Sequence, residues 1–297
     1  MMQEFHFRIA DFVWRLRLPV GCDVNALLPS FRAFRTEKPG GEPLLLTCDV
    51  EPLNGATAAA IDGRLLDESV NDMGLVRLYD RRGGYVVTLS ARPDGVMHRM
   101  TANRDFSEVR IALRFDDRDA GFILASLLRI AYSQAILYHE ALSIHASAVF
   151  HEGVAYLFMG RSGTGKSTHS SLWIRHLPGT ELLNDDNPTV RLRDGRAWAY
   201  GTPWSGKTPC YRPLAFPIGG MVRLSQAPEN RFRRQEGANA FVALYPGCSV
   251  ICQDSDLLSR LYDTLIRLAE SVPVGLLACR PDAEAARLCY ESLHGIR

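Results

Sequence analysis

The amino-acid sequence predicts an α/β fold with a mixed β-sheet in its C-terminal part, preceded by a smaller β-rich N-terminal domain. Three observations predict it. Strand-like segments with tight turns dominate residues 1–117, a glycine-rich loop between an apolar strand and a helix occupies residues 160–167, and alternating strand and helix patterns follow. We therefore expect one domain over residues 1–117 and a second over residues 118–297.

Composition and charge exclude several classes of protein. Of the 297 residues, 46% are hydrophobic and 23% are charged, and the net charge is +1, which does not favour a nucleic-acid or membrane partner. The first thirty residues carry acidic side chains and no long apolar core, unlike a secretory signal. The seven cysteines are odd in number and widely spread. We expect reduced thiols and a cytoplasmic protein.

Alternation and turn residues predict strands in the N-terminal domain. Apolar and arginine side chains alternate over residues 14–18, the pattern of a half-buried strand. Residues 44–48 are a second candidate strand, and residues 75–80 and 85–90 flank a glycine-containing turn, which predicts a hairpin. Residues 109–113 form the last expected strand of this region.

Residues 120–138 are long and largely apolar, and they admit two interpretations. Leucine, alanine and tyrosine recur at helical spacing after Asp119, which predicts a buried helix with an aspartate cap. The alternative is a membrane span, but Arg129 would then lie near the bilayer centre at substantial cost. We expect the buried helix.

The glycine-rich loop is a complete phosphate-binding P-loop, with the pattern G-x-x-x-x-G-K-[ST]. It follows an apolar run at 154–159 and precedes a helical segment at 167–174, the context that such a loop needs. Glycines permit unusual backbone angles, and loop amides then point at an anion. We expect a nucleoside triphosphate, ATP, to be bound by Gly160, Arg161, Ser162, Gly163, Thr164, Gly165, Lys166, Ser167 and Thr168.

Two adjacent carboxylates follow the loop at short range. Asp185 comes 19 positions after Lys166 (185 − 166), and Asp186 is next to it, at the end of a short apolar pair. One carboxylate can hold Mg²⁺ and the other can accept a proton from an attacking hydroxyl. The alternative is a solvated Asp-Asp turn before Asn187 and Pro188.

These residues together resemble the catalytic core of the HPr kinase/phosphorylase family. The resembling segments are Ile144-His145-Ala146-Ser147-Ala148, the loop Gly160 to Thr168, and Leu183-Asn184-Asp185-Asp186. The same pattern is similar to that of ATP-dependent phosphoenolpyruvate carboxykinase, which has a related fold. The resemblance covers about residues 140–190 and implies a P-loop kinase domain of this type.

The resemblance also implies roles for individual residues. Lys166 would contact the phosphates, Ser167 and Asp186 would hold Mg²⁺, and Asp185 would be the general base. The two aspartates could exchange these roles. His145 would sit beside the pair, and Arg212 is a candidate arginine for stabilising charge.

We therefore expect an ATP- and Mg²⁺-dependent phosphotransferase, a kinase that transfers the γ-phosphoryl group to a hydroxyl, with serine as the expected acceptor. The acceptor would belong to a protein, a peptide or a small molecule, and residues 1–117 are candidates for recognising it. Neither nucleic acid nor membrane is an expected partner, and a homo-oligomer is compatible with the sequence. The alternatives are a non-catalytic ATP-dependent binding or switch protein and a carboxykinase-like lyase.

Overall fold

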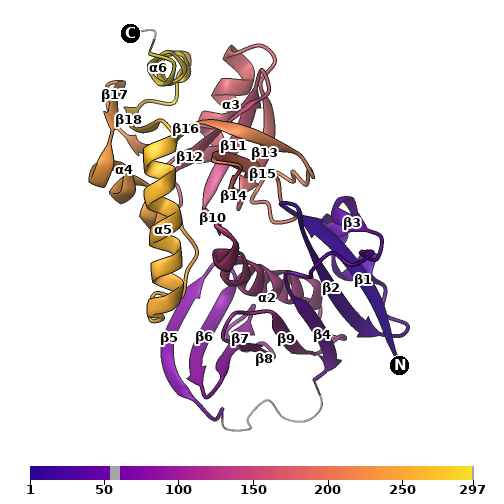
Figure 1. The fold of residues 1–297 in the computed structure, drawn as a ribbon. Coiled ribbons are helices and arrows are strands. Elements are labelled where there is room, and N and C mark those ends of the chain that lie inside the picture. Colours follow the sequence, from indigo (N-terminus) through magenta and orange to yellow (C-terminus); the bar gives the residue numbers. More distant parts are fainter. Residues whose placement is uncertain (54–60, 296–297) are drawn as a thin grey trace. The chain divides into compact units, whose positions relative to one another are not determined.

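The computed structural model describes residues 1–53 and 61–295, and the chain divides into two compact units (Figure 1). Unit 1 is Met1–Tyr138 and unit 2 is His139–Arg297; both combine helices with large mixed sheets. We expected the division near residue 117. It falls later because helix α2 (Ala120–Ala135) packs on the sheet of unit 1 and so belongs to that unit.

In the part of the chain that the structure describes, unit 1 contains a nine-stranded sheet of order β3-β1-β2-β4-β9-β8-β7-β6-β5. Its strands are β1 (Met2–Ile9), β2 (Phe12–Pro19), β3 (Arg35–Thr36), β4 (Thr47–Pro52), β5 (Arg64–Asn71), β6 (Gly74–Arg81), β7 (Gly84–Ser90), β8 (His98–Asn103) and β9 (Glu108–Leu113). The pairs β2–β4 and β4–β9 are parallel and the others are antiparallel. The short helices α1 (Val24–Leu27) and η1 (Pro29–Phe34) connect β2 to β3.

Side-chain alternation determines the two faces of this sheet. In β2, Trp14, Leu16 and Leu18 are buried, whereas Arg15 and Arg17 are only half-buried, as the alternation predicts. The hairpin predicted at 75–90 is present as β6 and β7. The strand expected at 44–48 begins only at residue 47. One face of the sheet therefore carries the apolar core, and helix α2 packs against β7, β8 and β9.

Helix α2 is the apolar segment for which a membrane span was the alternative. The run Ala120–His139 is long and apolar enough to cross a membrane, but 72% of its most apolar window is buried inside the structure, as in a core helix. Arg129 is largely buried and lies 3.7 Å from Asp72. The helix begins directly after Asp119, as predicted, but the Asp119 side chain forms no cap, because it accepts a hydrogen bond from Arg92 instead.

Unit 2 contains the second sheet, nine-stranded in the described residues, with the path β10-β14-β15-β16-β12-β11-β13 and a branch from β16 to β18 and β17. Its strands are β10 (Ala141–Ser143), β11 (Ala146–His151), β12 (Val154–Met159), β13 (Glu181–Asp186), β14 (Thr189–Arg193), β15 (Arg196–Tyr200), β16 (Ala215–Gln226), β17 (Arg231–Gln235) and β18 (Val274–Cys279). The pairs β12–β16 and β16–β18 are parallel. The short helix η2 (Ile136–His139) precedes β10.

Strand β16 occupies a central position that the sequence pattern did not predict, because Pro217 and two glycines interrupt it. The glycines have a packing role. A Cβ atom at Gly220 would lie 2.7 Å from side-chain atoms of Leu293, and one at Gly219 would crowd Tyr156. Gly220 therefore lets helix α6 (Ala283–Leu293) pack closely on the sheet, and Gly219 leaves room for side chains of the neighbouring strand β12.

Helix α3 (Lys166–His176) packs against α6, and helix α4 (Gly237–Leu244) packs against α5 (Ser255–Ser271). The short helix η3 (Tyr245–Gly247) lies between α4 and α5 in the chain. The core beneath α3 and α6 includes Trp173, Tyr156, Phe158 and Leu277, all buried. Asp282 caps α6 by accepting a hydrogen bond from the amide of Ala285. This packing fixes the start of α3 against β11, β12 and β13.

Candidate functional site

The glycine-rich loop joins the end of β12 to the start of α3, as the sequence predicts. Gly163 has φ 80° and Gly165, which precedes the first helical residue, has φ 105°. Residues with a Cβ atom rarely adopt these angles, so glycine is required at both places. The amide of Thr164 donates to the carbonyl of Arg161, and the loop closes on itself. The free amides at the start of α3 then form a cradle that suits an anion.

Lys166 is a buried cation in this cradle. Its Nζ donates to the carbonyl oxygens of Gly160 at 3.0 Å and Arg161 at 3.4 Å, so it spans the loop. Burial lowers the pKa of the Lys166 ammonium, and the carboxylates of Asp186 and Asp185 oppose that shift. The lysine therefore lies in the electrostatic field of both aspartates.

The remaining loop residues are accessible, and a cavity opens beside them. Arg161, Ser162, Ser167 and Thr168 are exposed. The cavity has a volume of about 470 Å³, and its walls include Gly163, Thr168, Leu224, Gln226 and Arg280. This volume is within the range of small-molecule sites. The sequence pattern did not identify its far wall, because strands β16 and β18 supply it from residues distant along the chain.

Asp185 is buried, and one of its two carboxylate oxygens accepts a hydrogen bond. Strand β13 pairs with β11 so that Ser147 lies opposite Asp185, and the Ser147 hydroxyl donates to Oδ1 at 2.8 Å. The same hydroxyl lies 2.6 Å from Oγ of Ser170 on α3. The other oxygen, Oδ2, is buried with no hydrogen-bond partner among the described residues. A buried oxygen in this condition is costly, which points to a place for a ligand's donor or a cation.

Asp186 and His145 are neighbours, as the resemblance implies. His145 Nε2 lies 3.5 Å from Asp186 Oδ1, and the histidine side chain is 45% exposed. His145 lies outside both neighbouring strands, at the break between β10 and β11, where its amide donates to the carbonyl of Gly247. The break lets the chain leave β14 and pair with β12 and β13.

Asn184 shapes the turn that carries both aspartates, and sequence reasoning missed it. Its side-chain oxygen accepts from the amides of Asp186 at 3.1 Å and Asn187 at 2.8 Å, and its amide group donates to the carbonyl of Trp204 at 3.0 Å. The amide of Gly206 donates to the carbonyl of Asp185 at 3.2 Å. Asn184 thus ties the aspartate pair to the loop after β15. An asparagine directly before two aspartates was the available signal.

Arg212 is not brought to this site. Its guanidinium donates to Glu181 at 2.8 Å, and both side chains are exposed. Glu181 begins strand β13, whereas Asp185 and Asp186 end it, so Arg212 lies near the other end of the strand. We therefore assign Arg212 no part in the reaction proposed below.

Comparisons with known proteins leave the family open. No protein-family model matches the chain, and no curated protein matches it either. Among solved structures, the chain is similar to the Hpr(Ser) kinase/phosphatase from Coxiella burnetii, with a TM-score of 0.31 and 13% identity over 52% of this chain and 93% of that chain. This likeness is too weak to assign a family, so the proposals below depend on the chain's own residues.

Proposed function

We propose that the protein is an ATP- and Mg²⁺-dependent kinase that transfers the γ-phosphoryl group to a hydroxyl. The observation that carries the proposal is the environment of the buried Asp185 carboxylate. One of its oxygens accepts a hydrogen bond from Ser147, and the other has no donor among the described residues. The carboxylate also interacts electrostatically with Lys166 of the P-loop. A loop that binds phosphate and a carboxylate that can accept a proton are the two parts that phosphoryl transfer requires.

The loop fits a triphosphate. Gly163 and Gly165 take positive φ angles, as in loops that bind anions through backbone amides, and Lys166 already donates to the loop carbonyls. Upon binding ATP, the ammonium would exchange these carbonyls for phosphate oxygens, which are stronger acceptors. The adjacent cavity of about 470 Å³ would hold the nucleoside.

Ser167 and Asp186 would hold Mg²⁺, which supplies positive charge that neutralises the phosphates. Among the described residues, no group of three or more His, Cys, Asp or Glu side chains could hold a metal ion. Mg²⁺ usually takes one or two protein oxygens and completes its shell with phosphate and water, so the oxygens of Ser167 and Asp186 would suffice. His145, with Nε2 3.5 Å from Oδ1 of Asp186, would orient that carboxylate.

Asp185 would accept the proton of the attacking hydroxyl. The Ser147 hydrogen bond fixes the orientation of the carboxylate, and Oδ2 is the oxygen left to receive a proton. The acceptor would be a serine hydroxyl of a protein or peptide, or a small-molecule hydroxyl, in the cytoplasm.

Two measurements test the proposal. MgATP should raise the melting temperature of the wild type, and Lys166→Ala should abolish that shift; an unchanged shift would contradict the P-loop assignment. Transfer of ³²P from γ-labelled ATP to free serine and to a library of serine peptides should occur with wild type and be lost in Asp185→Asn, which should still bind MgATP. Binding without any transfer would indicate a switch protein instead.

A further inference from the structure

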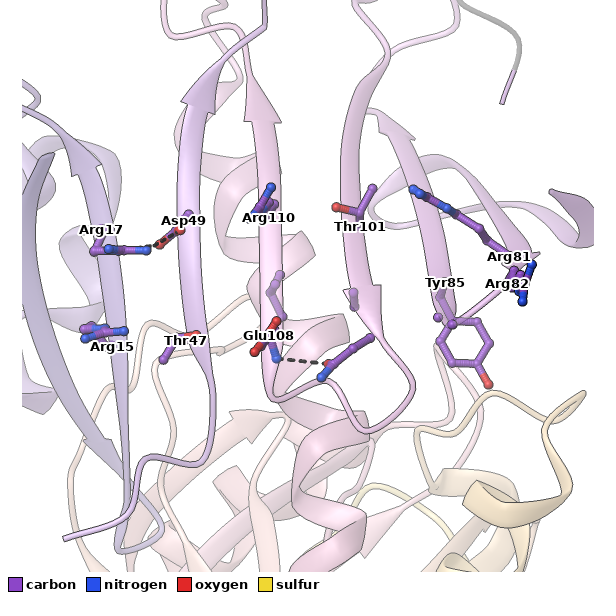
Figure 2. Close-up of a pocket in the computed structure, with 15 residues that line it drawn as sticks. Arg15, Arg17, Thr47, Asp49, Arg81, Arg82, Tyr85, Thr101, Glu108 and Arg110 are labelled. Atoms are coloured by element: carbon purple, nitrogen blue, oxygen red, sulfur yellow. Dashed lines mark hydrogen bonds and ion pairs between the residues drawn. The ribbon is translucent and has the colours of Figure 1, made fainter. Parts of the chain in front are cut away.

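The face of the unit 1 sheet opposite helix α2 forms an arginine-rich groove. A cavity of about 490 Å³ lies over strands β2, β4, β9, β8 and β7 and the end of β6 (Figure 2). Five arginines line it: Arg15, Arg17, Arg81, Arg82 and Arg110. The acidic side chains among its lining residues are Asp49 and Glu108. The groove therefore carries an excess of three positive charges (five minus two).

The strand register arranges these charges in rows across the sheet. Arg17 is opposite Asp49, Asp49 is opposite Arg110, and Arg110 is opposite Thr101. Figure 2 shows these side chains side by side on neighbouring strands. Arg15, two residues before Arg17 in β2, is opposite Thr47. The rows run at right angles to the strands, so a ligand that follows them would cross the sheet.

Three of the arginines have guanidinium groups with no partner among the described residues. Asp49 occupies Arg17 through both carboxylate oxygens. Within residues 1–53 and 61–295, no ion pair or hydrogen bond involves the guanidinium groups of Arg81, Arg82 or Arg110, and Arg81 accepts from Arg104 only through its backbone carbonyl. Guanidinium groups bind carboxylates through two parallel hydrogen bonds, so these three side chains are suited to carboxylate ligands.

The spacing of the arginines requires a long ligand. Five strand steps separate β2 from β6 in the sheet, and at about 4.8 Å per step they span roughly 24 Å. A single small anion cannot reach both ends. An extended peptide rises about 3.3 Å per residue, so about seven residues would cover the groove.

The chemistry of the groove favours a peptide over a nucleic acid. Single-stranded nucleic acids are bound on exposed aromatic rings, but the ring of Tyr85 is buried and stacked on Phe106. Asp49 and Glu108 would also repel a continuous row of phosphates, whereas a peptide can place neutral or basic residues beside them.

We propose that this groove binds an extended acidic peptide segment of a protein partner. Arg110 lies at its centre and Arg81 and Arg82 at one end, each paired with a carboxylate of the peptide. The proposal stands independently of the kinase reaction, because it concerns unit 1 alone. If both proposals hold, the peptide belongs to the phosphate acceptor or to a protein that delivers it.

The test measures binding of fluorescein-labelled octaglutamate to the full-length protein by anisotropy at about 0.1 M salt. Arg110→Glu and Arg82→Glu should each weaken binding by about tenfold or more, because each replaces an attraction by a repulsion. The matched control is Arg32→Glu, the same charge change at an exposed arginine of η1 outside the groove, which should change binding by less than about twofold. Circular dichroism would establish that all variants fold.

Three results would overturn the proposal. The first is equal binding by wild type and both groove variants. The second is displacement of octaglutamate by inorganic phosphate or citrate with an affinity equal to that of the peptide, which would indicate a small-anion site. The third is tighter binding of an eight-nucleotide oligothymidine through the same arginines, which would indicate a nucleic-acid site.

Discussion

Ser147 and Ser143 allow the hydrogen bond to Asp185 to be measured against a matched control. Both serines are buried, on consecutive strands of the same sheet. The Ser147 hydroxyl donates to Asp185 at 2.8 Å, whereas the Ser143 hydroxyl has no hydrogen-bond partner among the described residues. Replacing each by alanine removes the same atom from equally buried sites, so the difference between the variants measures the hydrogen bonds of the Ser147 hydroxyl, with Asp185 and with Ser170.

Ser147→Ala should destabilise unit 2 by about 1.5–3 kcal/mol, the usual contribution of a hydrogen bond to a charged group. Ser143→Ala should be neutral or slightly stabilising, because it removes a hydroxyl that is buried without a partner. The difference of about 2–3 kcal/mol corresponds to roughly 4–12 °C in melting temperature for a unit of this size. Tryptophan fluorescence during urea unfolding suits the measurement, since Trp173, Trp198 and Trp204 all lie in unit 2.

The same pair separates positioning from folding. If Ser147 orients the base, Ser147→Ala should lower kcat for phosphoryl transfer by about tenfold or more and leave KM for ATP nearly unchanged. Ser143→Ala should leave both constants unchanged. Equal unfolding free energies for the two variants, or equal kcat values, would refute the role given to the hydrogen bond.

Three further predictions concern other parts of the chain. Gly165→Ala and Gly179→Ala should each cost about 1–3 kcal/mol in backbone strain, because φ is 105° and 84°. A Cβ atom at Gly165 would make an ordinary contact at 3.9 Å with Thr168, and one at Gly179 would meet nothing within 4 Å, so neither site adds a steric clash. Only Gly165→Ala should abolish the thermal shift with MgATP. Trp173→Ala should destabilise unit 2 by about 3–5 kcal/mol in urea unfolding, because the Trp173 side chain is fully buried. Trp198→Ala should destabilise unit 2 by clearly less, because the Trp198 side chain is only partly buried, and equal losses of stability would contradict the core assignment. Burial lowers the pKa of His98 below its ordinary value of 6.5. As pH falls below 6.5, the unfolded chain therefore binds the proton before the folded chain does, and unit 1 should lose stability. His98→Gln should weaken this pH dependence, measured by unfolding at about pH 7 and about pH 5.

Local patterns predicted the parts of the site that lie close together in the chain. The strand before the loop, the loop, the helix after it and the strand ending in the aspartate pair are all present. The pairing of Ser147 with Asp185 was not predicted, because it depends on the register between β11 and β13. The pairing of Arg212 with Glu181 depends in the same way on how the loop after β15 returns to β13.

The groove of unit 1 was also not predictable from local sequence patterns, because it combines residues from several strands. Alternation predicted that Arg15 and Arg17 point away from the core, but it contained no information about which strands would lie beside β2. Only the sheet order placed Arg110 and Arg81 on the same face. Distant arginines form one groove because strand pairing joins segments that are far apart in the chain.

The sequence by itself determined the glycine-rich loop, the two carboxylates and the polarity of the faces of the strands that it predicted, because turn geometry, charge and alternation are local properties. The tertiary structure alone decided which oxygen of Asp185 is held, where the chain divides and which arginines share a surface. Those features depend on sheet register and helix packing, in which many weak contacts between distant segments select one arrangement.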